Sequence, residues 1–513
     1  MFVKVSLLVV FYVVTILVGM YFRKRNTSVD SFLLGGRAVG PWLTAFAYGT
    51  SYFSAVVFVG YAGQFGWRFG ISAVWIGLGN AFIGSLLAWV VLARRTRVMT
   101  RYLGSATMPD FFGIRYGSGT LKVGASVITF IFLVPYTASL YNGLSRLFAM
   151  AFSVDFTVCI AAMAMLTAIY VIMGGYTATA VNDFIQGVIM LFGIAAIIAA
   201  VLGVNGGFMP SLEALARVED SSVSPAPGIF SSFFGPAPLD LLGVILLTSV
   251  GTWGLPQMVQ KFYSIRSEKN INTGTVVSTI FAVFISGGCY FLGGLGRLFS
   301  DPAAVSAGGF DSIIPAMLSG FPPLLIGIVV LLVFSASIST LSALVMTSAS
   351  TFTLDFLKGN FIKSMGEKKQ LFIIRLLIAV FIAISSVIAT VQYKGRVSFI
   401  AQLMGISWGA LAGAFLAPFM YGLYWKRVTK EAVWCNFVFS TVLMTANILF
   451  RGSFPAILMS PINAGAFAML AGLVITPVVS LITPAPDKNR VDNCFACYEE
   501  EVAVRARESL GKG

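Results

Sequence analysis

The sequence predicts an all-α membrane protein with about thirteen transmembrane helices, ten of them in two corresponding blocks of five. Hydrophobic residues make up 58% of the 513 positions and charged residues only 11%, a composition that soluble domains do not have. Apolar runs of about 20 residues recur along nearly the whole chain, and each is long enough to cross a bilayer as a helix. Two of these runs, at corresponding places in the chain, are interrupted by helix-breaking residues.

The apolar runs give the elements in chain order. The first run ends in Arg23, Lys24 and Arg25 rather than in a small-residue cleavage site, so we expect a retained span and not a signal peptide. The predicted spans are 2–22, 41–65, 70–93, 122–150, 154–173, 181–203, 241–262, 273–298, 322–356, 371–392, 397–425, 431–450 and 462–484.

Charge in the predicted loops alternates along the chain. The loops after odd-numbered spans are basic, whereas the long loop 204–240 after the sixth span holds one cation, Arg217, against four acidic residues. The turn with Lys394 and Arg396 is the exception. The positive-inside rule then places the N-terminus outside and the C-terminus in the cytoplasm, in a plasma (inner) membrane. Since the loops account for the net charge of +14, it does not indicate a nucleic-acid partner.

The two interrupted spans suggest how the chain is divided. Gly49 lies at mid-depth in the second span, and Gly251, Gly254 and Pro256 interrupt the seventh. Either break alone is an ordinary kink, but a pair that opens two blocks of five spans is typical of inverted-repeat transporters, which bind substrate and ion beside the unwound backbone. The predicted parts are a first span and cytoplasmic loop (1–40), a first repeat (41–203), an extracellular loop (204–240), a second repeat (241–425), two peripheral spans (426–484) and a cytoplasmic tail (485–513).

The ninth predicted span carries an unusual number of hydroxyl groups. On a helix, Ser335, Ser339 and Ser342 stack on one face, with Ala336 and Thr340 beside them. Neutral hydroxyl oxygens are hard ligands, suited to an alkali ion that must later leave. Serine and threonine also bond back to their own helix and help helices to pack. The residues alone leave both interpretations open.

Enzyme chemistry has little support in the sequence. It shows no nucleophile–base pair, metal cluster or phosphate-binding loop, so we expect no enzyme. Cys494 and Cys497 form a lone CxxC in the tail, and the chain has no histidine to complete a zinc site. The absence of histidine also removes the usual proton relay near neutral pH.

Five stretches of sequence together resemble a known family. They are Asp30–Arg37 (DSFLLGGR), Met108–Arg115 (MPDFFGIR), Ile169–Gln186 (IYVIMGGYTATAVNDFIQ), Ala336–Ser342 (ASISTLS) and Tyr421–Lys426 (YGLYWK). The chain resembles, over about residues 1–485, the sodium:solute symporter family, which includes sodium/proline, pantothenate, sialic acid and galactose carriers. The resemblance implies a five-plus-five inverted-repeat core of the LeuT type, a small-molecule substrate and sodium as the coupling ion.

The resemblance also implies a sodium site. Ala336, Thr50 and Phe53 would supply backbone carbonyls, and Ser339 and Thr340 would supply hydroxyls. Some members bind a second sodium with two adjacent hydroxyls, but alanine occupies one of those positions here, beside Ser342. We therefore expect one sodium per cycle. We also expect the protein to function as a monomer.

Asp183 matches the family's acidic residue at the start of the sixth span. A carboxylate just inside a span is costly unless it faces water or a cation, so a role on the inward release path of the ion is favoured. The alternative is a helix N-cap, which aspartate forms well.

The predicted substrate pocket is mostly aromatic and apolar. Proline carriers have an aspartate at the position of Tyr52, and the region Ser72–Ile76 lacks the carboxylate of the sugar carriers. Half-helix N-termini receive a carboxylate without an arginine, which favours an amino acid or an organic acid. Any single aromatic residue of the pocket could instead be a packing residue. The pocket residues are Tyr52, Ser54, Val57, Trp75, Ser249, Thr252, Trp253 and Gln402.

Two rival functions remain open at this stage. A proton-coupled transporter would use Asp183 as its carrier. A membrane sensor derived from a transporter is the other, although the tail after residue 484 is too short to hold a kinase domain.

Overall fold

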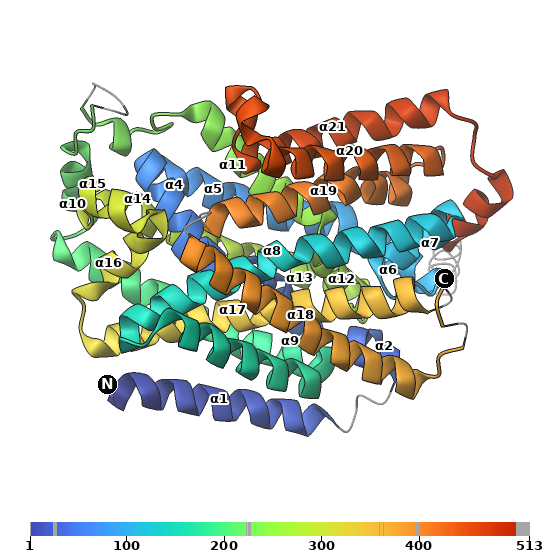
Figure 1. The fold of residues 1–513 in the computed structure, drawn as a ribbon, viewed down its shortest axis with the longest axis horizontal. Helices are drawn as coiled ribbons and strands as arrows, with labels where there is room; N and C mark the ends of the chain where they lie inside the picture. The colour runs from blue at the N-terminus through green and yellow to red at the C-terminus, as the bar shows by residue number, and fades with distance from the viewer. Residues whose placement is uncertain are drawn as a thin grey trace, which may run out of the picture.

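The computed structural model describes residues 2–23, 28–221, 223, 227–358, 360–362, 364–395 and 400–498. Long helices lie side by side along the longest axis of the molecule (Figure 1). Within these residues, β-structure is limited to two isolated bridges, Val39 with Ile265 and Lys358 with Ile362. The predicted all-α class is therefore confirmed.

The helices have the following bounds. They are α1 Phe2–Arg23, α2 Val29–Leu34, α3 Pro41–Tyr52, α4 Ala62–Phe69, α5 Val74–Gly79, α6 Arg94–Tyr102, α7 Met108–Tyr116, α8 Gly119–Phe152, α9 Phe156–Val204, α10 Phe208–Ala216, α11 Pro238–Val250, α12 Pro256–Tyr263, α13 Lys269–Ala282, α14 Gly288–Gly294, α15 Pro302–Gly308, α16 Ile313–Ser319, α17 Pro323–Thr351, α18 Glu367–Gly395, α19 Ile400–Tyr424, α20 Lys430–Leu449 and α21 Pro461–Ile482. Short 3₁₀ and π-helical segments join several of them.

Ten helices of the described chain are long and apolar enough to span a membrane, or eleven if the bent pair α11–α12 is one span. The difference from thirteen lies in two predicted spans. The span 41–65 is split, because α3 ends after 12 residues, and 154–173 gives only the short apolar helix Phe156–Ile169. The segment Phe156–Ile169 is the first part of α9, and Gly175, whose φ is 61°, kinks the chain before the rest of that helix. The count of thirteen stays a prediction.

Helix α17 lies at the centre of the bundle. Every residue from Leu332 to Thr351 is buried, and α1, α3, α8, α9 and α18 all pack against α17. Helix α1 forms one edge of the molecule, and α20 and α21 cover α19 at the opposite edge (Figure 1). A helix so enclosed has no face for lipid, so its hydroxyl groups must find partners inside the protein. The division into two repeats stays a prediction.

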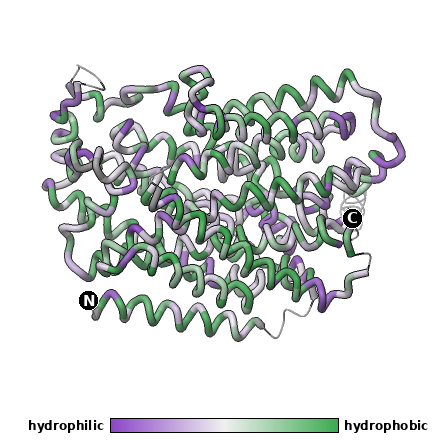
Figure 2. The backbone as a smooth tube through the Cα atoms, in the orientation of Figure 1, coloured by the Kyte–Doolittle hydropathy of each residue, from purple (hydrophilic) through white to green (hydrophobic). Residues whose placement is uncertain are grey.

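Polar residues gather toward the two ends of the long helices, and hydrophobic residues cover their middle parts (Figure 2). This is the distribution that a bilayer imposes on spanning helices. Helix α1 begins at one end of the bundle and α21 ends at the other (Figure 1). Which end faces the cytoplasm stays a prediction.

The chain after α21 folds back onto the end of the bundle. Residues 488–498 are helical, and Asp492 forms an ion pair with Lys426 at 2.7 Å. Cys494 and Cys497, the CxxC of the sequence, are buried on this helix, and the Cys497 thiol donates to the carbonyl of Cys494 at 3.3 Å. The tail up to residue 498 is therefore docked on the membrane-spanning part.

Candidate functional site: a buried oxygen cluster between two broken helices

Helix α3 stops in the middle of the protein. Its last residue is Tyr52, and Phe53 has extended backbone angles (φ −107°, ψ 116°). The Phe53 amide still donates to the carbonyl of Gly49, but the next carbonyls of a helix end have no partner in their own helix. Since Thr50 and Ser51 are fully buried, their carbonyl groups need partners from elsewhere.

Two hydroxyl groups of α17 supply those partners. The hydroxyl of Ser339 lies 3.0 Å from the carbonyl oxygen of Thr50 and 3.0 Å from that of Ala336. The Thr340 hydroxyl lies 3.3 Å from the carbonyl oxygens of both Thr50 and Ser51, and 3.0 Å from that of Ala336. Five oxygen atoms thus meet at the break in α3.

The cluster has more acceptors than protons. Each hydroxyl has one proton to donate, so the five contacts of Ser339 and Thr340 with carbonyl oxygens cannot all be hydrogen bonds at the same time. A small hard cation can contact all five oxygens at the same time. The set is neutral and made of oxygen alone, which is the chemistry that holds an alkali ion weakly enough for release. The residues present therefore fit sodium.

Four of the five predicted sodium-site residues meet in this cluster: Thr50, Ala336, Ser339 and Thr340. Phe53 sits at the break itself, and its ring stacks on Tyr52 with centroids 4.4 Å apart. The carbonyl of Ser51 is a member that the sequence interpretation missed. The signal for it was present, since Ser51 belongs to the same unpaired turn as Thr50.

The remaining hydroxyls of α17 divide between the two interpretations that the sequence left open. Ser342 donates to the carbonyl of Ile338 in its own helix at 2.7 Å. Ser337 also bonds its own helix, yet its oxygen accepts the amide of Ala55, just beyond the break in α3. Only part of the hydroxyl-rich stretch thus contacts the broken helix.

The second predicted break is also present. Helix α11 passes through the 3₁₀ turn Gly251–Gly254 into α12, with a bend of 47°. The Tyr52 hydroxyl donates to the carbonyl of Thr248 at 2.5 Å, which joins the end of α3 directly to α11. The Thr252 hydroxyl and the Trp253 indole bond the carbonyls of residues 84 and 83, respectively. The two broken helices are thus linked through Tyr52.

The other predicted pocket residues lie in different surroundings. Ser54 and Val57 are buried just after the break in α3, and Ser249 donates to Asn80 at 3.1 Å. The Trp75 indole donates instead to the carbonyl of residue 233, in the segment before α11. Gln402 accepts a hydrogen bond from Arg451 at 3.4 Å, beyond α20. The polar groups of Trp75 and Gln402 are thus bonded to partners outside the two broken helices.

Asp183 lies inside α9 and is almost completely buried. The helix runs unbroken past this position and its N-cap is Asp155, so the alternative of an N-cap role for Asp183 is wrong. Its carboxylate faces Lys261 of α12 at 3.8 Å, and neither oxygen has a hydrogen-bond partner among the described residues. The side chain of Lys261 is itself only 4% exposed.

A comparison with solved structures shows which class of protein this arrangement belongs to. A sodium-coupled sialic acid symporter, solved in a substrate-bound outward-open state, superimposes with a TM-score of 0.75. The match covers 95% of this chain and 99% of that one, at 15% sequence identity. The protein has the fold of the LeuT-type sodium symporters.

The family follows from the sequence comparison. The profile of the Sodium:solute symporter family matches residues 32–438, and the chain belongs to that family. Among its relatives, the osmoregulated proline transporter OpuE of Bacillus subtilis is 26% identical over 93% of this chain and 94% of its own length. The sodium/proline symporter of Staphylococcus aureus is 27% identical over 94% of this chain and 93% of its own length. The protein is thus a multi-pass membrane protein of a family of sodium-coupled solute transporters.

Proposed function

We propose that the protein imports a small organic solute, an amino acid or an organic acid, together with sodium by alternating access. The observation that carries this proposal is the cluster of five neutral oxygens where the hydroxyls of Ser339 and Thr340 meet the broken end of α3. Membership of the family supports sodium as the coupling ion. We expect one sodium per cycle and a functional monomer.

The geometry supplies a route by which sodium prepares the substrate site. The carbonyls of Thr50 and Ser51 belong to the cluster, and Tyr52 is the next residue in the chain. When sodium binds, it holds the last turn of α3 against α17 and so fixes where the Tyr52 hydroxyl meets Thr248 of α11. Binding of sodium and of substrate is then coupled because both favour the same arrangement of the two broken helices.

The substrate site lies beside Tyr52 in this proposal, lined by Ser54, Val57, Ser249, Thr252 and Trp253. Two relatives carry proline in their names, and proline is a small carboxylate-bearing solute like those expected here. The breaks in α3 and α11 create half-helix N-termini, and the positive end of a helix dipole suits a carboxylate without a buried arginine. The polar groups of Trp75 and Gln402 of the predicted set are bonded to residue 233 and Arg451 in this structure, so we expect them to contact the substrate only in another conformation.

Asp183 then serves the release of sodium toward the cytoplasm. Its pairing with Lys261 connects α9 to α12, the second half of the bent span. An ion leaving the cluster must pass helices that this pair holds together. Dependence of uptake on sodium rather than on pH distinguishes this role from the proton-coupled alternative, in which Asp183 is the carrier. The N-terminus lies outside and the tail in the cytoplasm in this proposal.

Uptake into proteoliposomes tests the function. A panel of labelled amino acids and organic acids would be offered under inward sodium, lithium or proton gradients. We expect one solute to accumulate with sodium alone, and Ser339→Ala/Thr340→Ala to abolish that accumulation. Ser350→Ala is the matched control. Ser350 is buried in the same helix, but its hydroxyl donates to the carbonyl of Thr347 within that helix, at 3.1 Å. Accumulation that follows pH and ignores sodium would refute the proposal and make Asp183 the residue to test.

A further inference from the structure

A cavity of about 420 Å³ lies at the end of the bundle on which the tail is docked. It differs from the sodium cluster in position and chemistry. Three valines, two arginines and two tyrosines line it. The lining residues are Val90, Val91, Arg94, Arg95, Val98, Tyr424 and Tyr498.

The cavity opens toward the membrane at the border of the apolar region. Val90 belongs to a predicted membrane span and is 62% exposed, so its side chain faces lipid. The chain changes from valine to arginine within five residues, at the start of α6. A transition of this kind marks the depth at which the hydrocarbon region ends and phospholipid headgroups begin. The cavity therefore contacts both parts of a lipid molecule.

The arginines are held in place by their neighbours. Arg95 lies between two rings, with its guanidinium carbon 4.3 Å from the centre of Tyr424 and 4.5 Å from that of Tyr498. Arg94 is half exposed and contacts Glu268 through Nε at 2.6 Å, so the four other N–H donors of its guanidinium lie outside this contact. Two ordered guanidinium groups at headgroup depth are suited to a phosphate group.

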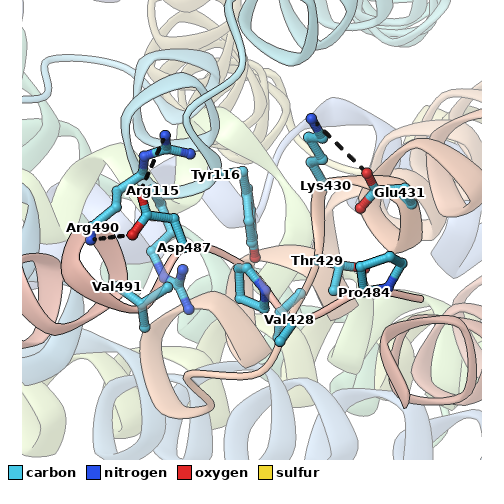
Figure 3. Close-up of a pocket in the computed structure, with 12 residues that line it drawn as sticks. Arg115, Tyr116, Val428, Thr429, Lys430, Glu431, Pro484, Asp487, Arg490 and Val491 are labelled. Carbon is cyan, nitrogen blue, oxygen red and sulfur yellow. Dashed lines mark hydrogen bonds and ion pairs between the residues drawn. The ribbon is translucent and has the colours of Figure 1, made fainter. Parts of the chain in front are cut away.

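A second cavity of about 330 Å³, lined in part by residues 484–487, Arg490 and Val491, differs in its charges (Figure 3). Its charged side chains include two opposite-sign pairs at 4.0 Å, Lys430 with Glu431 and Arg490 with Asp487. The 420 Å³ cavity has no carboxylate among its described lining residues. The 330 Å³ cavity is lined by three cations and two carboxylates, whereas the two arginines of the 420 Å³ cavity share its lining with valines and tyrosines alone.

We propose that this cavity binds an anionic phospholipid, with its phosphate on Arg94 and Arg95 and one acyl chain along Val90 and Val91. The lipid comes from the leaflet at the tail end of the bundle, which is the cytoplasmic leaflet in the orientation proposed above. Tyr498 belongs to the tail, and its hydroxyl donates to the carbonyl of Arg95 at 3.2 Å. Lipid binding therefore stabilises the docked tail against α6 and the end of α19.

Native mass spectrometry of the full chain tests this site. The protein would be purified in detergent and incubated with phosphatidylglycerol or, separately, phosphatidylcholine. We expect phosphatidylglycerol to be retained in preference, with affinity about fivefold weaker for each arginine replaced, equivalent to about 1 kcal/mol. The variants are Arg94→Gln and Arg95→Gln. Arg101→Gln, on the same helix but away from the cavity lining, is the control and should retain the lipid.

Three results would overturn the proposal. The first is equal retention of the two lipids, which would leave no role for the charge. The second is an equal loss of phosphatidylglycerol in Arg101→Gln, which would indicate only the general basic surface. The third is thermal stabilisation by inorganic phosphate as large as that by phosphatidylglycerol, which would indicate an ion site. Arg94→Gln keeps the test valid if Arg95→Gln misfolds, because the Arg94 side chain is half exposed.

Discussion

Removing the Thr340 hydroxyl while keeping the shape of the side chain isolates one oxygen of the cluster. Thr340→Val replaces the hydroxyl by a methyl group of similar size. The hydroxyl lies within 3.3 Å of three carbonyl oxygens, more than any other side chain of the cluster. The variant should therefore lose affinity for sodium and keep the fold.

The size of the effect follows from what the oxygen does in each state. Interactions of a hydroxyl with a charged group contribute about 1.5–3 kcal/mol, so the apparent dissociation constant for sodium should rise about 10- to 150-fold. Without sodium, the variant loses the hydrogen bond that the hydroxyl makes to the carbonyls of Thr50, Ser51 or Ala336, which costs about 1 kcal/mol of stability.

Thermal unfolding of the purified protein at a series of sodium concentrations measures both the dissociation constant for sodium and the stability without it. A ligand that binds the folded state raises the unfolding temperature according to its affinity. Thr353→Val is the matched control: Thr353 is buried at the end of the same span, but its hydroxyl bonds its own helix at Ala349, at 2.8 Å. A sodium midpoint that is the same in Thr340→Val and in the native chain would refute the assignment of this oxygen.

Three further predictions concern other groups. Tyr52→Phe removes the hydroxyl that joins the two broken helices, so sodium-driven uptake should show a raised KM, with sodium binding nearly unchanged. Lys261→Met leaves the buried Asp183 carboxylate without its partner and should cost about 3–5 kcal/mol, which Lys261→Met/Asp183→Asn should largely restore in thermal unfolding. Burial raises the pKa of Asp311, on the loop before α16, to about 6. Since this pKa lies above the unfolded value of 3.8, the neutral carboxyl favours the folded state. The stability that this group contributes is present below about pH 4 and is lost as the pH rises through about 6. Asp311→Asn should flatten that part of the plot of unfolding free energy against pH.

The breaks in the helices were predictable from the sequence because they depend on local chemistry. Glycines in the second span, and glycines with Pro256 in the seventh, disfavour a continuous helix wherever they stand. The structure ends α3 at Tyr52 and bends the chain at Gly251–Gly254, as these residues indicate. The approach of Ser339 and Thr340 to the first break followed from the resemblance, and the distances agree with it.

Contacts between distant parts of the chain were not predictable. The Tyr52 hydroxyl donates to the carbonyl of Thr248, which is 196 residues away in the sequence, and the residues around Tyr52 do not indicate this partner. Lys261 comes at the end of an apolar run that indicates no partner for it, but the chain bends by 47° and places it opposite Asp183. Trp75 looked like a pocket residue, yet its indole bonds the segment before α11. In each case the packing of a second element decides the position.

Binding of radioactive sodium to the purified protein tests the central claim most directly, since it needs no knowledge of the solute. The account predicts saturable binding of about one sodium per chain, weakened at least tenfold in Thr340→Val and unchanged in Thr353→Val. Sodium binding of equal strength in the native chain and in Thr340→Val would contradict it, because the ion would then lie away from the cluster at the broken end of α3.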